Sequence, residues 1–316
     1  MTKIRVLYSV IVVSCIMCGC SGISNRSERL EYEKQIDRAI LSHGFDGTIL
    51  VADNDGIIFE RAYGYSDGSA ESDPETTTSY EVGSLTKQFT AAAILRLAED
   101  GKLKLDDKLS IFYPECEWSH EFTVSDLLNM NTRIPDYKNN CDFALITTKK
   151  EVESEILSYT IGNEVTGYCN SNYYLLGLII EEVSQMTYED YISTVLLAPA
   201  GLKDTGINTD YKSFAAGAMY SNVYDMYNWN KAYFDGEIIP EKYLSELEEK
   251  ESGYLYGFRC EPDTYYHEGH TDNFSSYMKY NKNSGIYVIL LSNENNQGIS
   301  NYGNEVYEIT IKYMEQ

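Results

Sequence analysis

The sequence lacks the cysteine spacing of a structural zinc site. It has seven cysteines in 316 residues, and three of them lie within the first twenty. The remaining four are scattered and form no CxxC pair: Cys116, Cys141, Cys169 and Cys260. Because zinc frameworks hold their thiolates at short, regular spacings, we predict no metal site and expect no cofactor. Free or buried thiols are the default expectation for these four side chains.

Basic residues are scarce as well. Lys and Arg number 25 against 49 Asp and Glu, which gives a formal net charge of -24 at pH 7. A surface of this sign repels phosphate backbones, so we predict that the protein binds no nucleic acid. The excess of carboxylates is typical of a soluble surface.

The apolar run at the N-terminus is too short to favour a membrane-spanning helix, which needs about 20 residues. Lys3 and Arg5 precede the run from Val6 to Met17, a pattern that predicts a signal peptide over residues 1–20. Met17-Cys18-Gly19-Cys20 resembles a bacterial lipoprotein processing site, which implies lipidation of Cys20. We therefore expect export and a lipid anchor on the outer face of the bacterial cell membrane, with plain secretion as the alternative.

Strand patterns lie near both ends of the chain, and helical patterns fill its middle. Strands are expected at 47–52, 57–65, 254–260, 264–267, 274–280 and 285–291. Helices are expected at 26–43, 81–101, 172–185, 187–197, 222–234, 240–250 and 302–315, with a short one from 124 that ends at 134–136. The order predicts an α+β fold with one domain at 26–316. Its antiparallel sheet comes from about 26–83 and 251–316, flanked by the terminal helices, and a mostly helical part from about 84–250 is inserted.

The candidate nucleophile is Ser84, at the start of the helix expected over 81–101. Lys87 follows three residues later, and positions i and i+3 share a helix face. The helix is apolar nearly all round from Phe89 to Ala98, so we expect it to be buried. A lysine in apolar surroundings loses affinity for its proton and can activate a serine. The structural alternative is a helix-capping serine followed by a solvated lysine.

A second S-x-x-K match occurs at Ser276 and Lys279, within a predicted strand. Residues i and i+3 of a strand point to opposite faces, so we predict that this second pair cannot cooperate.

Two further motifs follow Ser84-Leu85-Thr86-Lys87 in order: Tyr168-Cys169-Asn170, before an apolar helix, and His267-Glu268-Gly269, on a C-terminal strand. This series resembles the serine β-lactamase and penicillin-binding-protein superfamily, especially its class C branch and the related D-alanyl-D-alanine carboxypeptidases and esterases. Its motifs are S-x-x-K, Y-x-N, and K-T-G or H-x-G. Y-x-N matches also begin at Tyr137, Tyr220 and Tyr302, but Tyr168 alone stands directly before the run NYYLLGLIIEEVS, as in the family. The resemblance spans roughly residues 40–295 and implies a β-lactamase/transpeptidase-like fold.

The resemblance implies a catalytic role for three residues. Ser84 attacks a carbonyl and is acylated, and Lys87 takes its proton or keeps a neighbour deprotonated. Tyr168 passes a proton to the leaving group and later activates the deacylating water. We expect the charge of Lys87 to lower the pKa of Tyr168.

It also implies a set of substrate-binding residues. Asn170 orients Lys87 and a substrate amide. His267, in the H-x-G motif with Gly269, binds a substrate carboxylate or tunes Tyr168. The backbone N–H groups of Ser84 and His270 form the oxyanion hole.

The implied function is a serine hydrolase that acts through an acyl-enzyme on a small-molecule or peptidoglycan-peptide substrate: D-Ala peptides, β-lactams or small esters. Three departures from the family pattern bear on this: the run LLNMNTRIPDY, Asn273 in place of a glycine, and the bulky His270. The last two touch the expected pocket, which favours wall trimming or esterase activity over efficient β-lactamase activity. They also motivate the alternative of a penicillin-sensing or cell-wall-binding lipoprotein without turnover.

Overall fold

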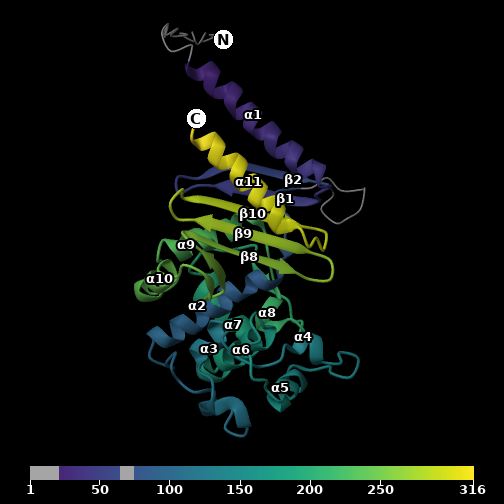
Figure 1. Cartoon of the computed structure of the whole chain (residues 1–316), viewed down its shortest axis with the longest axis vertical. Helices are drawn as coiled ribbons and strands as arrows, with labels where there is room; N and C mark the ends of the chain where they lie inside the picture. Colours follow the sequence, from purple (N-terminus) through teal and green to yellow (C-terminus); the bar gives the residue numbers. More distant parts are fainter. Residues whose placement is uncertain (1–20, 65–74) are drawn as a thin grey trace, which may run out of the picture.

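A seven-stranded antiparallel sheet joins the two ends of the chain (Figure 1). The computed structural model describes residues 21–64 and 75–316, so the predicted signal peptide and Cys20 lie outside the described residues. The strands are β1 (Gly47–Ala52), β2 (Ile57–Tyr63), β6 (Gly253–Leu255), β7 (Phe258–Glu261), β8 (Thr264–His270), β9 (Ser275–Asn281) and β10 (Ile286–Ser292). Their order is β2-β1-β10-β9-β8-β7-β6, and β1 pairs with β10 from Gly47↔Ser292 to Ala52↔Tyr287. The predicted fold class is therefore confirmed.

Two terminal helices cover one face of this sheet, α1 (Ser21–Ser42, purple) and α11 (Ile299–Met314, yellow) (Figure 1). Val288 and Leu290 of β10 face them, within the same apolar cluster as Ile36 and Val306. Ile289 and Leu291 point the opposite way, into the larger core. Because successive side chains of a strand alternate between faces, β10 is apolar at every position from 286 to 291, and each is buried.

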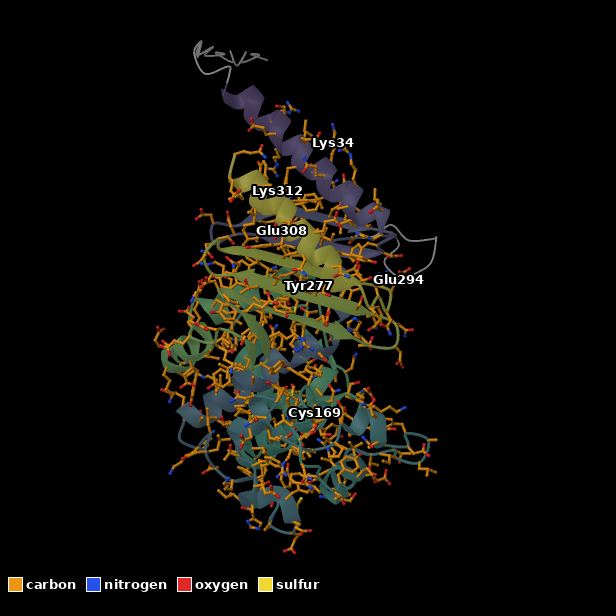
Figure 2. All side chains as sticks on the ribbon, in the orientation of Figure 1. Lys34, Cys169, Tyr277, Glu294, Glu308 and Lys312 are labelled. Atoms are coloured by element: carbon orange, nitrogen blue, oxygen red, sulfur yellow. The ribbon has the colours of Figure 1, made fainter. Side chains whose placement is uncertain are left out.

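Helix α11 approaches the sheet closely over Tyr277, which Figure 2 labels on the sheet beside this helix. A Cβ on Gly303 would lie 2.1 Å from the Tyr277 ring, so a larger residue there would displace the helix. Cys169 lies in the helical part on the other side of the sheet (Figure 2).

The opposite face carries the inserted helical part. Its α-helices are α2 (Thr86–Glu99), α3 (Val124–Leu128), α4 (Tyr137–Asn140), α5 (Lys149–Ser158), α6 (Asn170–Ser184), α7 (Tyr188–Ile192), α8 (Phe214–Gly217), α9 (Val223–Phe234) and α10 (Glu241–Glu248). Short turns are η1 (Gly83–Leu85), η2 (Leu109–Ile111), η3 (Glu117–His120) and η4 (Ser193–Leu197). A small second sheet has the order β3 (Tyr80–Glu81), β5 (Met219–Ser221), β4 (Gly206–Ile207). Across the described ranges, no helix is long and apolar enough to cross a membrane.

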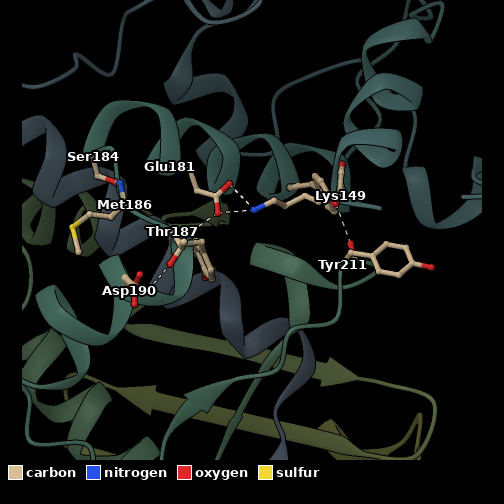
Figure 3. A network of polar contacts seen from close by, with 9 residues as sticks. Lys149, Glu181, Ser184, Met186, Thr187, Asp190 and Tyr211 are labelled. Carbon is tan, nitrogen blue, oxygen red and sulfur yellow. Dashed lines mark hydrogen bonds and ion pairs between the residues drawn. The ribbon is translucent and has the colours of Figure 1, made fainter. Parts of the chain in front are cut away.

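An ion pair ties α6 to α5 at a distance from the sheet (Figure 3). Lys149 Nζ lies 2.6 Å from both carboxylate oxygens of Glu181. Glu181 also accepts a hydrogen bond from the backbone N–H of Tyr188, at 3.0 Å, and Thr187 caps α7. These contacts fix the course of α6, whose first residue is Asn170.

Several element boundaries differ from the sequence-based prediction. The helix expected over 81–101 is a 3-10 turn followed by α2, and Gly101 follows it with a φ of +69°. The strand expected over 254–260 is a hairpin, because Tyr256 and Gly257 both have positive φ. The helix from 124 ends at Leu128 rather than at 134–136, and Met130 then has a φ of +56°. The second sheet has strands of two or three residues, too short for a periodic pattern to reveal.

Candidate active site

Ser84 and Lys87 lie at the junction of η1 and α2, beneath the end of strand β8. Lys87 Nζ is 2.9 Å from Ser84 Oγ, and the lysine side chain is fully buried. The tight turn depends on Gly83, which has a φ of +50°; a Cβ there would lie 2.8 Å from the His270 nitrogen. The predicted meeting of the hydroxyl with the amine is therefore present, in a 3-10 turn that leads into the helix.

Three oxygen atoms surround the Lys87 amine. Besides Ser84 Oγ, they are Asn170 Oδ1 at 2.9 Å and the backbone carbonyl of Ala216, on α8, at 2.6 Å. Burial lowers the pKa of Lys87 to about 7, and the nearby carboxylate of Asp136 partly opposes this effect. Near neutral pH, a large fraction of the amine is therefore uncharged and able to accept a proton.

Asp136 is a residue of the site that sequence reasoning missed. Its Oδ2 atom accepts hydrogen bonds from Asn170 Nδ2 at 2.8 Å and from the Asn170 backbone N–H at 2.9 Å. The other carboxylate oxygen caps α4 by accepting from the Lys138 N–H. Asp136 thereby turns the amide of Asn170 so that its oxygen faces Lys87. The sequence-based prediction places Asp136 only at the end of a helix.

Two basic side chains lie close to the ring of Tyr168. Lys87 Nζ is 5.0 Å and Arg259 Cζ is 5.1 Å from the centroid of its ring. The Tyr168 hydroxyl is buried, and no group in the described part of the chain completes a hydrogen bond with it. Burial raises the pKa of Tyr168, while the nearby Ser84 hydroxyl and Arg259 act in the opposite direction. The expectation that the pKa would be lowered overall is wrong, because desolvation outweighs the neighbouring charges.

His267 is also fully buried, and both of its ring nitrogens have partners. Nδ1 lies 2.6 Å from the carbonyl of Glu268, which can only accept, so Nδ1 carries the proton. Nε2 then accepts from the Tyr254 hydroxyl at 3.1 Å. Burial, followed by the charge of Lys87, lowers the pKa of His267 to about 3. The imidazole is therefore neutral and supplies no charge for a carboxylate or for Tyr168.

Glycine allows β8 to lie against the turn that carries the serine. A Cβ on Gly269 would lie 2.1 Å from the Val82 carbonyl oxygen and 2.8 Å from the Ser84 nitrogen. The turn that carries Ser84 therefore packs directly against the end of β8 that carries His270, the two residues whose backbone N–H groups are expected to form the oxyanion hole. The imidazole of His270 reaches the Asn296 carbonyl, at 3.2 Å from Nε2, and is held there.

These side chains border a cavity of about 1220 Å³. Its lining includes Ser84, Tyr168, Asn170, Arg259, His267 and His270, together with Asn273 on the turn after β8. Of the departures from the family pattern, Asn273 and His270 line this cavity. The run 127–137 does not line the cavity, but it supplies Asp136, which holds Asn170, and Thr132, which donates a 2.7 Å hydrogen bond to Asn172.

The alternative motif matches lie elsewhere. Ser276 donates to the Val82 carbonyl, whereas Lys279 extends to Asn304 on α11, so this pair is divided between the two faces of the sheet as predicted. Tyr137 donates its hydroxyl to the Lys212 carbonyl. Within the described ranges, no cluster of three or more His, Cys, Asp or Glu could hold a metal ion. The thiols of the four cysteines beyond residue 20 are free.

Comparison with known proteins identifies relatives of this chain. Residues 33–305 match the family described as Beta-lactamase. The putative penicillin-binding protein PbpX of Bacillus subtilis (strain 168) is 27% identical over 310 residues, which cover 89% of this chain and 79% of PbpX. Protein flp of Staphylococcus aureus (strain MW2) is 27% identical over 322 residues; the match covers 84% of this chain and 64% of flp, so this chain spans less than two thirds of that relative.

Solved structures share the fold at lower identity. D-amino acid amidase from Ochrobactrum anthropi SV3 has a TM-score of 0.79 and 20% identity, covering 90% of this chain and 100% of the amidase. FmtA from Staphylococcus aureus has a TM-score of 0.78 and 20% identity, covering 88% of this chain and 89% of the other. The family match over most of the chain is decisive: this chain belongs to the Beta-lactamase family and is a serine hydrolase of that superfamily.

Proposed function

We propose that this protein hydrolyses small esters and peptides that end in D-alanine, through an acyl-enzyme on Ser84. One observation carries the proposal: a fully buried lysine, with its pKa lowered to about 7, lies 2.9 Å from the hydroxyl of Ser84. A serine needs such a base to become a nucleophile near neutral pH.

Acylation begins when Ser84 Oγ bonds to the substrate carbonyl carbon and its proton passes to neutral Lys87. The carbonyl oxygen, now negative, is stabilised by the backbone N–H groups of Ser84 and His270, each worth roughly 3 kcal/mol in the transition state. Tyr168 is protonated at neutral pH because burial raises its pKa. Its hydroxyl gives a proton to the leaving group as the bond to carbon breaks, and the proton on Lys87 restores the phenol.

Deacylation uses the same groups in reverse. As a water molecule attacks the ester carbon, Tyr168 passes its own proton to neutral Lys87 and takes one from the water. Ser84 Oγ then departs with the proton that Lys87 now holds, which returns all three groups to their starting state. Asn170 keeps the amine in place throughout, because Asp136 holds its amide from the other side.

The cavity supports a substrate larger than a simple ester. At about 1220 Å³ it has room for a short peptide, and its lining mixes Lys138 and Lys212 with Asp210 and Glu268. The names of relatives point the same way, since one is a putative penicillin-binding protein and a protein of the same fold is a D-amino acid amidase. We therefore rank D-alanyl peptides and esters above β-lactams as substrates that turn over.

The test is the intact mass of the protein after incubation with penicillin G and, separately, with p-nitrophenyl acetate. We expect an adduct in the wild-type protein and none in Ser84→Ala, with Ser276→Ala as the matched control that still forms it. An adduct on Ser84→Ala would refute the proposal. Stoichiometric, lasting acylation by every substrate, D-alanyl peptides included, would instead identify a sensor without turnover.

We also propose that the protein is exported and held on the outer face of the cell membrane by a lipid on Cys20. The support is the sequence of residues 1–20 alone. Cys20→Ser should move the protein from the membrane fraction to the medium, and an unchanged distribution would refute the anchor.

A further inference from the structure

Arg259 belongs to the cavity, although none of the three motifs includes it. It lies on β7, opposite Tyr266 of β8. The residues before and after it, Phe258 and Cys260, are buried in the core. Its guanidinium carbon is 5.1 Å from the centroid of the Tyr168 ring, within the range of a cation–π contact. A charged side chain therefore stacks on the residue that we assign to proton transfer.

The guanidinium has little else to bind. Its Nε atom is buried, and no acceptor in the described part of the chain hydrogen-bonds to it. Arg259, Glu261 and Glu268 also line a separate pocket of about 360 Å³, yet neither carboxylate comes within 4.0 Å of the guanidinium to form an ion pair. An arginine stays protonated at every pH at which proteins fold, so its charge acts on whatever lies against it, and that is the phenol ring.

The phenol needs such a fixed charge because the other two basic groups beside its ring, Lys87 and His267, are not permanently charged. His267 is neutral, since burial lowers its pKa to about 3. Lys87 is charged only while it holds a proton, and its pKa is about 7. When Tyr168 gives its proton to a leaving group, the phenolate that remains is buried and requires a positive charge close by.

We infer that Arg259 is a positioning residue: it holds the ring of Tyr168 and stabilises the phenolate that forms as the leaving group departs. This inference rests on the proposed function. Two carboxylates, Asp136 and Glu268, act on Tyr168 in the opposite direction, and the uncharged rings of Tyr254 and His267 pack beside it. Arg259 therefore supplies a permanent positive charge beside Tyr168 that opposes the effect of these two carboxylates.

The test compares leaving groups, with neutral substrates so that no carboxylate is involved. p-Nitrophenolate departs without protonation, whereas ethoxide needs a proton as the bond breaks. We expect Arg259→Gln to lower kcat/KM for p-nitrophenyl acetate by less than about threefold and for ethyl acetate by about tenfold or more. Arg259→Lys should recover part of the loss. Lys279→Gln, which removes a charge from the same sheet, should match the wild type on both esters.

A double mutant isolates the pair. In a Tyr168→Phe background, Arg259→Gln should change kcat/KM for ethyl acetate no further, because its effect passes through the phenol. Equal losses on both esters, or additive effects in the double mutant, would overturn the inference. A loss confined to peptides with a free carboxylate would assign Arg259 to substrate anchoring instead, which also overturns it. If Ser84→Ala still hydrolyses the esters, the proposed function fails; if hydrolysis depends on Ser84 but the leaving-group pattern is absent, only this inference fails.

Discussion

The chain contains the S-x-x-K pattern twice. The serine and the lysine meet in the first copy and lie on opposite faces of the sheet in the second. Lys87 is fully buried and lies 2.9 Å from the hydroxyl of Ser84. Lys279 is half-buried, 2.9 Å from Asn304 Oδ1 and 4.2 Å from the centroid of the Tyr307 ring, while Ser276 faces the other side of the sheet. Both lysine amines also donate to an asparagine side chain at the same distance, because Asn170 Oδ1 lies 2.9 Å from Lys87 Nζ. The pattern alone therefore carries no chemistry.

The difference between the copies is one of geometry and not of the direction in which burial moves the pKa. Three residues make nearly one turn of a helix and bring the two side chains together, whereas on a strand they place them on opposite faces. Burial also lowers the pKa of Lys87 to about 7, and it lowers that of Lys279 as well. Within the described residues Lys279 makes its hydrogen bond to Asn304 and none to a serine, so its lowered pKa activates no nucleophile.

The largest expected effect removes each amine in turn. Lys87→Met should lower kcat/KM for p-nitrophenyl acetate by roughly a thousandfold, because a positioned base contributes about 10²–10⁴ to the rate. Lys279→Met should stay within twofold of the wild type. Initial rates of both variants, with circular dichroism to confirm folding, check the prediction. A similar loss in the two variants would show that the second lysine is part of the machinery.

The next effect is on stability, and its sign follows from burial. Between about pH 7 and 10.5, the unfolded chain holds a proton on Lys87 that the folded protein has lost, so this group makes the protein more stable as pH rises. Below pH 7 the buried ammonium destabilises the fold by at most about 5 kcal/mol, taken as roughly 1.4 kcal/mol per pKa unit. Lys87→Met removes this buried charge. The free energy of unfolding of the variant, relative to that of the wild type, should therefore be highest at pH 6 and decrease towards pH 10.

Urea unfolding at several pH values measures that difference. The pH-independent consequences of losing the hydrogen bonds cancel, since only the slope against pH is compared. Lys279→Met should show a slope of the same sign but smaller, because Lys279 is half exposed. An advantage of Lys87→Met that does not change with pH would mean that the lysine keeps its proton when folded.

Sequence reasoning could place the three motifs but not all that surrounds them. The opposite fates of the two S-x-x-K copies follow from periodicity, and so do the sheet strands β1, β9 and β10. The partners of Ser84 and Lys87 are another matter. Asp136 and Arg259 reach the site from a loop and from strand β7, and only the fold shows that they do. The one local signal was an arginine within the apolar run YLYGFRC.

One expectation is wrong. Tyr168 was expected to have a lowered pKa, because the expectation counted the neighbouring charge alone. The depth of burial decides this pKa, and for Tyr168 and His267 alike it depends on Tyr254 and on the hairpin that carries it. Positive φ at Tyr256 and Gly257 makes this hairpin out of what reads as one strand.

The smallest expected effect comes from neutralising a carboxylate beside each lysine while the amine is kept. Asp136 raises the pKa of Lys87 against the effect of burial, so Asp136→Asn should lower that pKa by less than about one unit. The acidic limb of kcat/KM reports the base in the free enzyme, and it should move to lower pH, which leaves the variant relatively more active at pH 6. Asparagine has one acceptor oxygen where aspartate uses two, so the variant side chain can accept from the Asn170 amide or cap α4, but not both. The readout is therefore the position of the acidic limb, not the rate at its plateau.

Glu261→Gln is the matched change at the second copy, because Glu261 raises the pKa of Lys279 in the same way. It should leave the acidic limb where it is in the wild type. An acidic limb that stays at its wild-type position in Asp136→Asn, with a lower rate at every pH, would mean that Asp136 acts by orienting Asn170 rather than by its charge, since a misplaced amide slows the reaction without making Lys87 a weaker base. A limb that moves with Glu261→Gln would mean that the two lysines share one electrostatic environment, and the contrast between the copies would then rest on their geometry alone.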